Sequence, residues 1–317
     1  MKKTYKTLDL FAGIGGIRAG FENAGFETVY SNDFDKHCKI TYDLNYKTAQ
    51  LDNSDIWSLL DKHIPKFDIL LGGFPCQAFS IAGYRDGFND LKGRGNLFFA
   101  IAQLIKKYQP EGFLLENVKN LHTHDKGRTF EKIKKTLEID LGYSVDYRIL
   151  NSMEYGNVPQ NRERIYIVGF KNKITLEKFK WPNKIKLTKK VEDLLSNQVD
   201  PKYYYENKPL FQKLKDFEFK KGTVYQWRRV YVRENKRGVC PTLTANMGTG
   251  GHNVPIIKDS IGIRKLTPAE CFKLQGFDKN FKLPLNLPDS SLYKQAGNSV
   301  SVPVVEAVGK QMIKALK

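Results

Sequence analysis

Residues 4–16, TYKTLDLFAGIGG, decide the fold, because a short apolar strand runs here into a glycine-rich turn and then into a helix. We expect the strand over Thr4–Leu10 and the helix over Gly15–Ala24. Glycines at such a turn let a ligand approach the backbone closely, and open α/β sheets bind nucleotide-like ligands at this edge. The stretch therefore predicts an α/β fold with a ligand site after the first strand.

Outward from this stretch, the first half of the chain alternates short apolar runs with helical patterns, which indicates a parallel sheet flanked by helices. Further strands are expected at Glu27–Asn32, Asp68–Gly72, Gly112–Glu116, Val145–Leu150 and Arg164–Phe170. Further helices are expected at Asp35–Asn45, Asn96–Tyr108 and Thr129–Leu141.

The alternation stops near Trp181, and the chain stays irregular to about Pro288. This change predicts a second, smaller domain of mostly β and irregular structure. Within it, Thr267-Pro-Ala-Glu270 is a capping box with proline at the first helical position, so a helix should begin there. The apolar spacing of Pro303–Lys317 suits a helix that returns to the first domain.

The charge balance points to a polyanionic partner. The 317 residues contain 52 Lys and Arg against 34 Asp and Glu, a net charge of +18, so nucleic acid is the first candidate. The sequence shows neither a long apolar run nor a leader pattern, which predicts a soluble, cytoplasmic protein without membrane attachment. The cysteines lack CxxC spacing, so we expect free thiols, no disulfide framework and no metal.

An acidic and an aromatic residue extend the first ligand signal. Asp33 ends the second expected strand, about twenty residues after the glycine turn, where a carboxylate can accept hydrogen bonds from ribose hydroxyls. Phe34 beside it could stack on an adenine ring. The GxGG spacing of Gly13–Gly16 differs from the GxGxxG of dinucleotide sites and suits adenosine with a cationic sulfonium tail.

A cysteine follows the strand expected at Asp68–Gly72. The segment Gly73-Phe-Pro-Cys-Gln-Ala-Phe-Ser80 places Cys76 at the carboxyl edge of the sheet, facing the ligand crevice. A lone cysteine in a turn is more often a small buried residue. Here the loop that follows is rich in glycine and could close over a substrate, which favours a nucleophile. The thiolate is the reactive form, so a cation or proton acceptor must lie nearby.

Two further segments reach the same edge of the sheet. Glu116 ends a buried strand, and Gln160-Asn-Arg-Glu-Arg164 supplies Arg162 and Arg164 on alternate positions. Together with Cys76, these residues have the chemistry for methyl transfer to cytosine. A thiolate that adds to C6 of cytosine turns C5 into an enamine carbon able to attack a methyl sulfonium. Protonated Glu116 could hydrogen-bond N3 and Arg164 could bind O2, with Arg162 positioning Arg164 or the substrate.

With these motifs the chain resembles the bacterial DNA (cytosine-5)-methyltransferase family, and it is close in size to the small single-specificity members of that family. The matching motifs occur in family order along nearly the whole chain: Phe11–Gly16, Asp33-Phe34, Asp55-Ile56, Pro75-Cys-Gln77, Leu97–Phe99, Glu116–Val118, Gln160–Arg164 and Gly297–Val300. The resemblance implies S-adenosylmethionine as cofactor, without a metal. It also implies cofactor contacts from Phe11, Ile14, Gly16, Asp33, Phe34, Asp55, Ile56, Pro75, Leu97, Asn298 and Val300.

The resemblance further implies a catalytic domain of residues 1–182 with 292–317, and a target-recognition domain of residues 183–291. Duplex DNA is then the partner. The protein is expected to act as a monomer, functionally paired with a cognate endonuclease in a type II restriction-modification system. C6 of a stacked cytosine is out of reach of a thiol, so the base must be flipped out.

The DNA-reading candidates lie in two regions. In the second domain, aromatics and arginines interleave in Tyr225–Arg233, and similarity to the family suggests that Gln226 fills the vacated space and that Arg229 reads a base. An edge strand with alternating exposed charge is the plainer interpretation. The full set of candidate DNA contacts is Gln77, Ser80, Arg94, Gln226, Arg228, Arg229, Arg233 and Thr244. Several relatives have Ser-Ile-Ser-Gly where this chain has Ser80-Ile-Ala-Gly83, so Ala82 lacks a second hydroxyl for DNA.

Two other functions fit parts of this pattern. The same chemistry could act on RNA, although residues between the two parts of the first domain suffice for a full DNA-reading domain. A non-catalytic DNA-binding protein could keep the fold, but binding alone does not need the set Cys76, Glu116 and Arg164.

Overall fold

The computed structural model describes residues 3–75, 97–235, 237–249 and 252–317. The chain divides into two compact units, each discontinuous in sequence. The first unit comprises Met1–Leu150, Glu163–Asn183 and Val305–Lys317, and the second comprises Asn151–Arg162 and Lys184–Val304. The functional division into residues 1–182 with 292–317 and residues 183–291 stays a prediction, because compactness does not show which part binds DNA.

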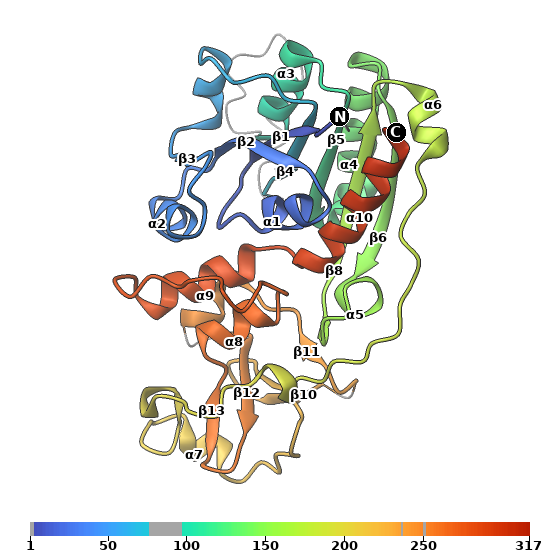
Figure 1. Ribbon diagram of the computed structural model, residues 1–317. Coiled ribbons are helices and arrows are strands. Elements are labelled where there is room, and N and C mark those ends of the chain that lie inside the picture. Colours follow the sequence, from blue (N-terminus) through green and yellow to red (C-terminus); the bar gives the residue numbers. More distant parts are fainter. Residues whose placement is uncertain (1–2, 76–96, 236, 250–251) are drawn as a thin grey trace. The chain divides into compact units, whose positions relative to one another are not determined.

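A central sheet organises the first unit (Figure 1). Within the described residues it has seven strands in the order β3-β2-β1-β4-β5-β8-β6. Their bounds are β1 Lys6–Leu10, β2 Glu27–Asn32, β3 Leu51–Asp52, β4 Ile69–Gly73, β5 Gly112–Val118, β6 Ser144–Asn151 and β8 Glu163–Phe170. The chain reverses its direction of travel across the sheet between β3 and β4, which is where open α/β sheets bind ligands.

The sheet is mixed, which corrects the expectation of a parallel sheet. β1, β2, β3, β4 and β5 pair in parallel, but β8 pairs antiparallel with β5. A parallel connection needs a crossover of about a dozen residues or more, usually a helix. Only Ser152–Arg162 separates β6 from β8, and this segment holds the short helix α5 (Ser152–Tyr155) and β7 (Gln160–Asn161). β8 therefore enters the sheet without a helical crossover.

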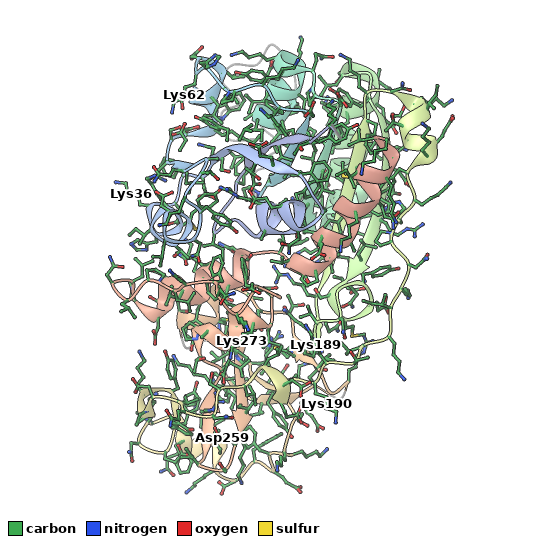
Figure 2. The ribbon with its side chains drawn as sticks, viewed as in Figure 1. Lys36, Lys62, Lys189, Lys190, Asp259 and Lys273 are labelled. Atoms are coloured by element: carbon green, nitrogen blue, oxygen red, sulfur yellow. The ribbon has the colours of Figure 1, made fainter. Side chains whose placement is uncertain are left out.

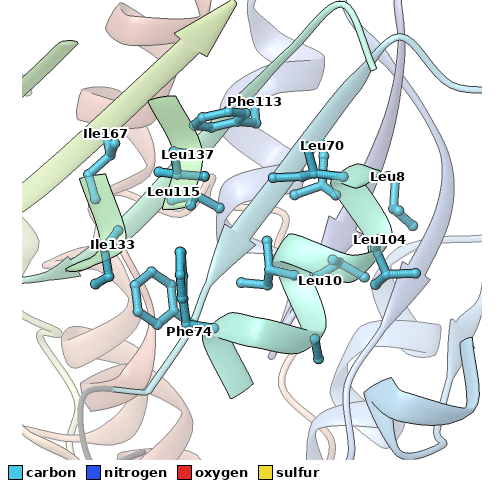
Figure 3. Packing of buried hydrophobic residues seen from close by; sticks show 14 of the residues in the cluster. Leu8, Leu10, Leu70, Phe74, Leu104, Phe113, Leu115, Ile133, Leu137 and Ile167 are labelled. Carbon is cyan, nitrogen blue, oxygen red and sulfur yellow. The ribbon is translucent and has the colours of Figure 1, made fainter. Parts of the chain in front are cut away.

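Helices cover both faces of this sheet. The helices of the first unit are α1 Gly16–Asn23, α2 Lys36–Asn45, α3 Leu97–Tyr108, α4 Arg128–Lys135, α6 Lys173–Lys178 and, from Val305 onward, α10 Val302–Ala315. On one face, α3 and α4 pack over the central strands and bury Leu8, Leu104 and Leu137 (Figure 3). On the other face α10 packs against α1, and a side chain at Gly20 would overlap Val305. Strands covered on both faces read as near-continuous apolar runs, as β4 does.

The predicted strands and helices of the first half are confirmed, with small shifts at their ends. Asp35 lies just before α2 rather than within it, and its carboxylate accepts hydrogen bonds from the backbone N–H groups of His37 and Cys38. The helix expected over Thr129–Leu141 is in two parts, because α4 continues as a π-helical turn over Thr136–Asp140. The edge strand β3 is only two residues long and was missed in the sequence.

The second unit has a small antiparallel sheet, in accord with the predicted mostly β domain. Within the described residues its four strands lie in the order β10-β9-β12-β13, and a two-stranded ladder joins β11 to β7. The bounds are β9 Tyr225–Trp227, β10 Val232–Glu234, β11 Cys240–Pro241, β12 Val254–Lys258 and β13 Ile263–Lys265. Tyr205, Leu214 and Phe219 bury apolar surface against this sheet.

Short helices complete the second unit: α7 Phe211–Leu214, α8 Pro268–Lys273, α9 Asp289–Asn298 and the 3₁₀ turn η10 Ala245–Thr249. The capping box predicted at Thr267 is confirmed, since its side chain accepts from the Glu270 N–H while Glu270 accepts from the Thr267 N–H. Lys189 and Lys190 of this unit are exposed, and both are labelled in Figure 2.

Candidate active site

The glycine-rich turn after β1 is held by contacts from two other elements. Phe11, Gly13 and Gly15 have positive φ angles of 53°, 54° and 82°, which only the glycines adopt without strain. The Gly13 N–H donates to Asp33 Oδ2 at 2.8 Å. The Tyr46 hydroxyl donates to the Gly15 carbonyl at 2.8 Å. The turn is therefore fixed before any ligand arrives.

Asp33 and Phe34 lie at the end of β2, beside this turn. The carboxylate of Asp33 accepts from the backbone N–H groups of Gly13 and Asp35, each at 2.8 Å. A carboxylate is an acceptor group with about four lone-pair sites in all, which is the chemistry that ribose hydroxyls can donate to. The side chain of Phe34 is 75% exposed. An exposed aromatic ring, a carboxylate and a glycine turn at one sheet edge fit an adenosine ligand.

Arg18, a buried arginine that was not predicted from the sequence, supports the turn. Arg18 on α1 is 2% exposed, and its Nη1 donates to the Tyr42 hydroxyl and to the Thr48 carbonyl, each at 2.9 Å. Its guanidinium also lies 4.2 Å from the centre of the Tyr46 ring. Arg18 thereby connects α1, α2 and the tyrosine that binds Gly15. The available signal was an arginine among the apolar residues Ile17, Ala19 and Phe21 of α1.

The other predicted cofactor residues of the first unit differ in exposure. Ile14 and Ile56 are buried at 1% and 4%, and they pack within the unit. Asp55 is exposed, and its carboxylate accepts from the Trp57 N–H at the start of the 3₁₀ turn η1 (Ile56–Leu60). Pro75 is exposed after β4, and Leu97 is half-buried as the first residue of α3. Gly16 is buried as the first residue of α1.

Glu116 and Arg164 form an ion pair on neighbouring antiparallel strands. The Nε of Arg164 lies 3.1 Å from Glu116 Oε1, and the two side chains are 13% and 10% exposed. Arg164 pairs with Val118 in the ladder, so it lies diagonally across from Glu116 on the same face. On its other side Glu116 pairs with Gly73 of β4. The predicted acid and base-binding arginine are thus brought together beside the strand that leads to Cys76.

The residue after Glu116 anchors the start of the cysteine segment. The side-chain amide of Asn117 is 3% exposed and donates to the Phe74 carbonyl at 2.8 Å. Phe74 is buried, two residues before Cys76. Asn117 was not among the predicted site residues, although it lies within the Glu116-Asn-Val118 motif. Cys76, Gln77, Ser80, Ala82 and Arg94 lie outside the described residues.

Arg162 belongs to the second unit and differs from Arg164 in its contacts. It is 2% exposed, and its guanidinium donates to the carbonyl oxygens of Leu243, Gly297 and Ser299. The predicted cofactor residues Asn298 and Val300 also belong to this unit, at the end of α9 and just after it. Arg162 therefore binds backbone on both sides of Asn298.

The predicted DNA contacts of the second unit divide into buried and exposed residues. Gln226 is 6% exposed on β9, which lies between β10 and β12 and is not an edge strand. Arg229 is exposed in the β9–β10 turn with a φ of 69°, and Arg233 is exposed on β10. Arg228 and Thr244 are half-buried. Filling a space in DNA would require Gln226 to leave its buried position.

Most of the chain matches a known protein family. Residues 5–314 match the family described as C-5 cytosine-specific DNA methylase. The chain belongs to that family. As a C-5 cytosine-specific DNA methylase it acts on cytosine in DNA, and the family implies S-adenosylmethionine as methyl donor.

Individual relatives cover nearly all of this methylase. It is 51% identical over 312 residues to the type II methyltransferase M.Bsp6I of Bacillus sp. (strain RFL6), covering 97% of this chain and 98% of that protein. It is 44% identical to M.SsoII of Shigella sonnei, covering 98% of this chain and 81% of that protein. M.HhaI of Haemophilus parahaemolyticus is 37% identical over 95% of this chain and 92% of that protein.

Solved structures agree in fold. The S. pombe Dnmt2 methyltransferase superposes with a TM-score of 0.76 over 99% of both chains, at 20% identity. The Entamoeba histolytica methyltransferase EhMeth gives a TM-score of 0.75 over 100% of both chains, at 18% identity.

Among the described residues of this methylase, no group of three or more His, Cys, Asp or Glu could hold a metal ion. No helix in the described part of the chain combines the length and apolarity needed to cross a membrane.

Proposed function

We propose that this methylase transfers a methyl group from S-adenosylmethionine to C5 of a cytosine flipped out of duplex DNA, through a covalent bond between Cys76 and C6. The observation that carries the proposal is the Glu116–Arg164 pair at 3.1 Å, beside the strand that leads to Cys76. An acid and an arginine on one sheet face can contact N3 and O2 of one pyrimidine ring.

The chemistry requires a nucleophile and stabilisation of negative charge. The Cys76 thiolate adds to C6, and the ring electrons move toward N3 and O2, where Glu116, in its protonated form, and Arg164 donate hydrogen bonds. When bound, S-adenosylmethionine supplies an electrophilic methyl group. C5 then carries both the methyl group and its proton. Removal of that proton and departure of the thiolate from C6 restore the aromatic ring.

The two parts of the chain divide the work in this proposal. Residues 1–182 with 292–317 bind cofactor and carry out methyl transfer, and residues 183–291 read the DNA. The exposed Arg229 and Arg233, together with Arg228 and Thr244, supply contacts in the second part. Arginine bidentate to guanine is the commonest specific base contact, and the turn between β9 and β10 presents Arg229 to solvent. Gln77, Ser80 and Arg94 supply contacts from the segment after Cys76.

The biological setting is a restriction-modification system. Relatives that span nearly the whole chain are named type II methyltransferases, which supports a modification enzyme paired functionally with a cognate endonuclease. A single small recognition part suits a short palindromic site, methylated by a monomer.

Trapping of the covalent adduct tests the proposal. Bisulfite sequencing of plasmid DNA methylated in vitro first identifies the site. A duplex that carries 5-fluorocytosine at the target position should then form a denaturation-resistant adduct with the wild-type protein plus S-adenosylmethionine, because fluorine blocks the final elimination.

Cys76→Ala should form no adduct and no 5-methylcytosine while it still binds the duplex. Cys38→Ala is the matched control, because it removes a buried thiol of α2 and should leave trapping intact. An active wild-type protein that gives no adduct would exclude the covalent mechanism. Methyl incorporation into tRNA equal to that into duplex DNA would instead favour RNA as a substrate.

A further inference from the structure

A buried polar cluster in the second unit contacts two segments to which different ligands are assigned. We call Gln160, Arg162 and Gln275 the Arg162 cluster. Their side chains are 0%, 2% and 0% exposed. The parallel pairing of β7 with β11 places Gln160 and Arg162 alongside the segment that begins at Cys240. Buried polar side chains of this size are stable only when they are hydrogen-bonded, so their partners define their role.

The first partner is the peptide backbone of Leu243, which the cluster binds on both sides. Gln160 Oε1 accepts from the Leu243 N–H at 3.0 Å. Arg162 Nη1 donates to the Leu243 carbonyl at 2.8 Å. Leu243 directly precedes Thr244, a proposed DNA contact. The position of this DNA-contacting segment therefore depends on the two side chains.

The second partner is the backbone around Asn298. Arg162 Nη2 donates to the Gly297 carbonyl at 3.0 Å and also to the Ser299 carbonyl. A second route of hydrogen bonds also connects the cluster to this backbone. Gln160 Nε2 donates to Gln275 Oε1 at 3.3 Å, and Gln275 Nε2 donates to the Ala296 carbonyl at 2.7 Å. Asn298 and Val300 are the proposed cofactor contacts of this unit.

The two segments also touch directly. A Cβ at Gly297 would lie 2.2 Å from the carbonyl carbon of Thr244, so only glycine fits at this position. A shift of Thr244 would thus displace Gly297 or break its contact. The guanidinium is a rigid planar fork, so carbonyls bound to its two ends keep a fixed separation. Neither segment can move by itself without loss of buried hydrogen bonds.

We infer that Arg162 is a positioning residue that couples DNA binding at the Thr244 segment to cofactor binding at Asn298 and Val300. This inference rests on the proposed function, which assigns those ligands. Each ligand orders its own segment, and the Arg162 cluster transmits that order to the other segment, so each ligand strengthens binding of the other. Coupling between sites is reciprocal and typically amounts to about 5–150-fold. Arg162 need not touch the cytosine.

The test is a thermodynamic cycle with S-adenosylhomocysteine and duplex DNA that carries the site found by bisulfite sequencing. The dissociation constant of DNA is measured with and without saturating S-adenosylhomocysteine, and that of S-adenosylhomocysteine with and without DNA. For the wild type, both ratios should give the same coupling factor, above about 5-fold. Arg162→Lys keeps the charge but not the fork, so its coupling factor should fall toward 1, with each ligand alone bound within about 3-fold of wild type.

Two more variants separate coupling from damage to the fold. Gln275→Met removes only the second route and should lower the coupling factor partly, which keeps the test informative if Arg162→Lys does not fold. Arg264→Lys is the matched control, because Arg264 is a buried arginine of the same unit that binds Glu270 and Asp259 instead of the two segments. It should lower the melting temperature and keep the coupling factor.

Three results would overturn the inference. They are a wild-type coupling factor of 1, full coupling in Arg162→Lys, or an equal loss of coupling in Arg264→Lys. A wild-type protein that binds DNA and cofactor without coupling would leave the proposed function intact. A wild-type protein that binds neither would overturn both.

Discussion

At the scale of single residues, a substitution of Arg164 tests whether its positive charge alone is enough or whether its planar guanidinium is needed. Its Nε lies 3.1 Å from Glu116 Oε1 on the adjacent strand. Arg164→Lys keeps a positive charge but loses the planar donor geometry. We expect methyl transfer in single-turnover assays to slow by about 10²–10³-fold, the usual effect of removing one donor to a developing negative charge.

Arg148→Lys provides the control for this substitution. Arg148 is exposed on β6 of the same sheet and makes no contact with Glu116 in the described structure. Its rate should equal that of the wild type. A normal rate in Arg164→Lys would remove Arg164 from the catalytic set.

The buried carboxyl group of Asp9 should make the stability of the protein depend on pH. It lies at 0% exposure in β1, and burial raises its pKa to about 8, although the nearby Arg18 guanidinium opposes the rise. In the unfolded chain the carboxyl titrates near 3.9. Between about pH 4 and pH 8 the folded state therefore holds a proton that the unfolded state releases. The stability that Asp9 contributes is complete below pH 4 and is lost as the pH rises toward 8.

Asp9→Asn mimics the protonated acid at every pH and should remove this dependence. The free energy of unfolding of the variant, relative to wild type, should rise by on the order of a few kcal/mol between pH 5 and pH 8. Urea denaturation of both proteins at several pH values measures the difference. Parallel pH profiles would show that Asp9 does not titrate in this window.

At the scale of elements, Tyr46 at the end of α2 supports the glycine-rich turn after β1. Tyr46→Phe removes the hydroxyl that donates to the Gly15 carbonyl at 2.8 Å but keeps the ring on which Arg18 stacks. One such hydrogen bond is worth about 0.5–1.5 kcal/mol, so S-adenosylhomocysteine should bind about 2–10-fold more weakly. Affinity for DNA alone should not change.

Tyr143→Phe is the matched control for this prediction. The Tyr143 hydroxyl also donates to a backbone carbonyl, that of Pro110, at 2.7 Å, but it does so away from the glycine turn. This variant should lose stability without losing cofactor affinity. Equal cofactor affinity in both variants would contradict a role for Tyr46 in holding the turn.

At the scale of the whole molecule, the net charge of +18 should dominate the salt response. A protein that contacts roughly six to ten phosphates releases counterions and loses about 10³–10⁵-fold in affinity between 50 and 200 mM salt. Fluorescence anisotropy with a labelled duplex measures this slope. A flat salt profile would show that the basic surface does not bind the DNA backbone.

Local sequence was sufficient to predict the elements whose causes are local. The glycine turn at Phe11–Gly16 and the capping box at Thr267 each depend on residues within a few positions. The same holds for the motifs at strand ends, because the carboxyl ends of parallel strands meet at one sheet edge. The Glu116–Arg164 contact did not follow from this rule, because Arg164 lies at the start of β8 and reaches the carboxyl end of β5 only through the antiparallel direction of β8.

Tertiary structure alone decided the direction of β8, the inner position of β9 and the different partners of Arg162 and Arg164. Each depends on pairing between segments far apart in the chain, such as β7 with β11. The two arginines look equivalent in sequence, two positions apart on a strand. Arg164 faces a carboxylate, whereas Arg162 faces backbone carbonyls that only folding brings within reach, because a buried guanidinium must find acceptors wherever the fold supplies them.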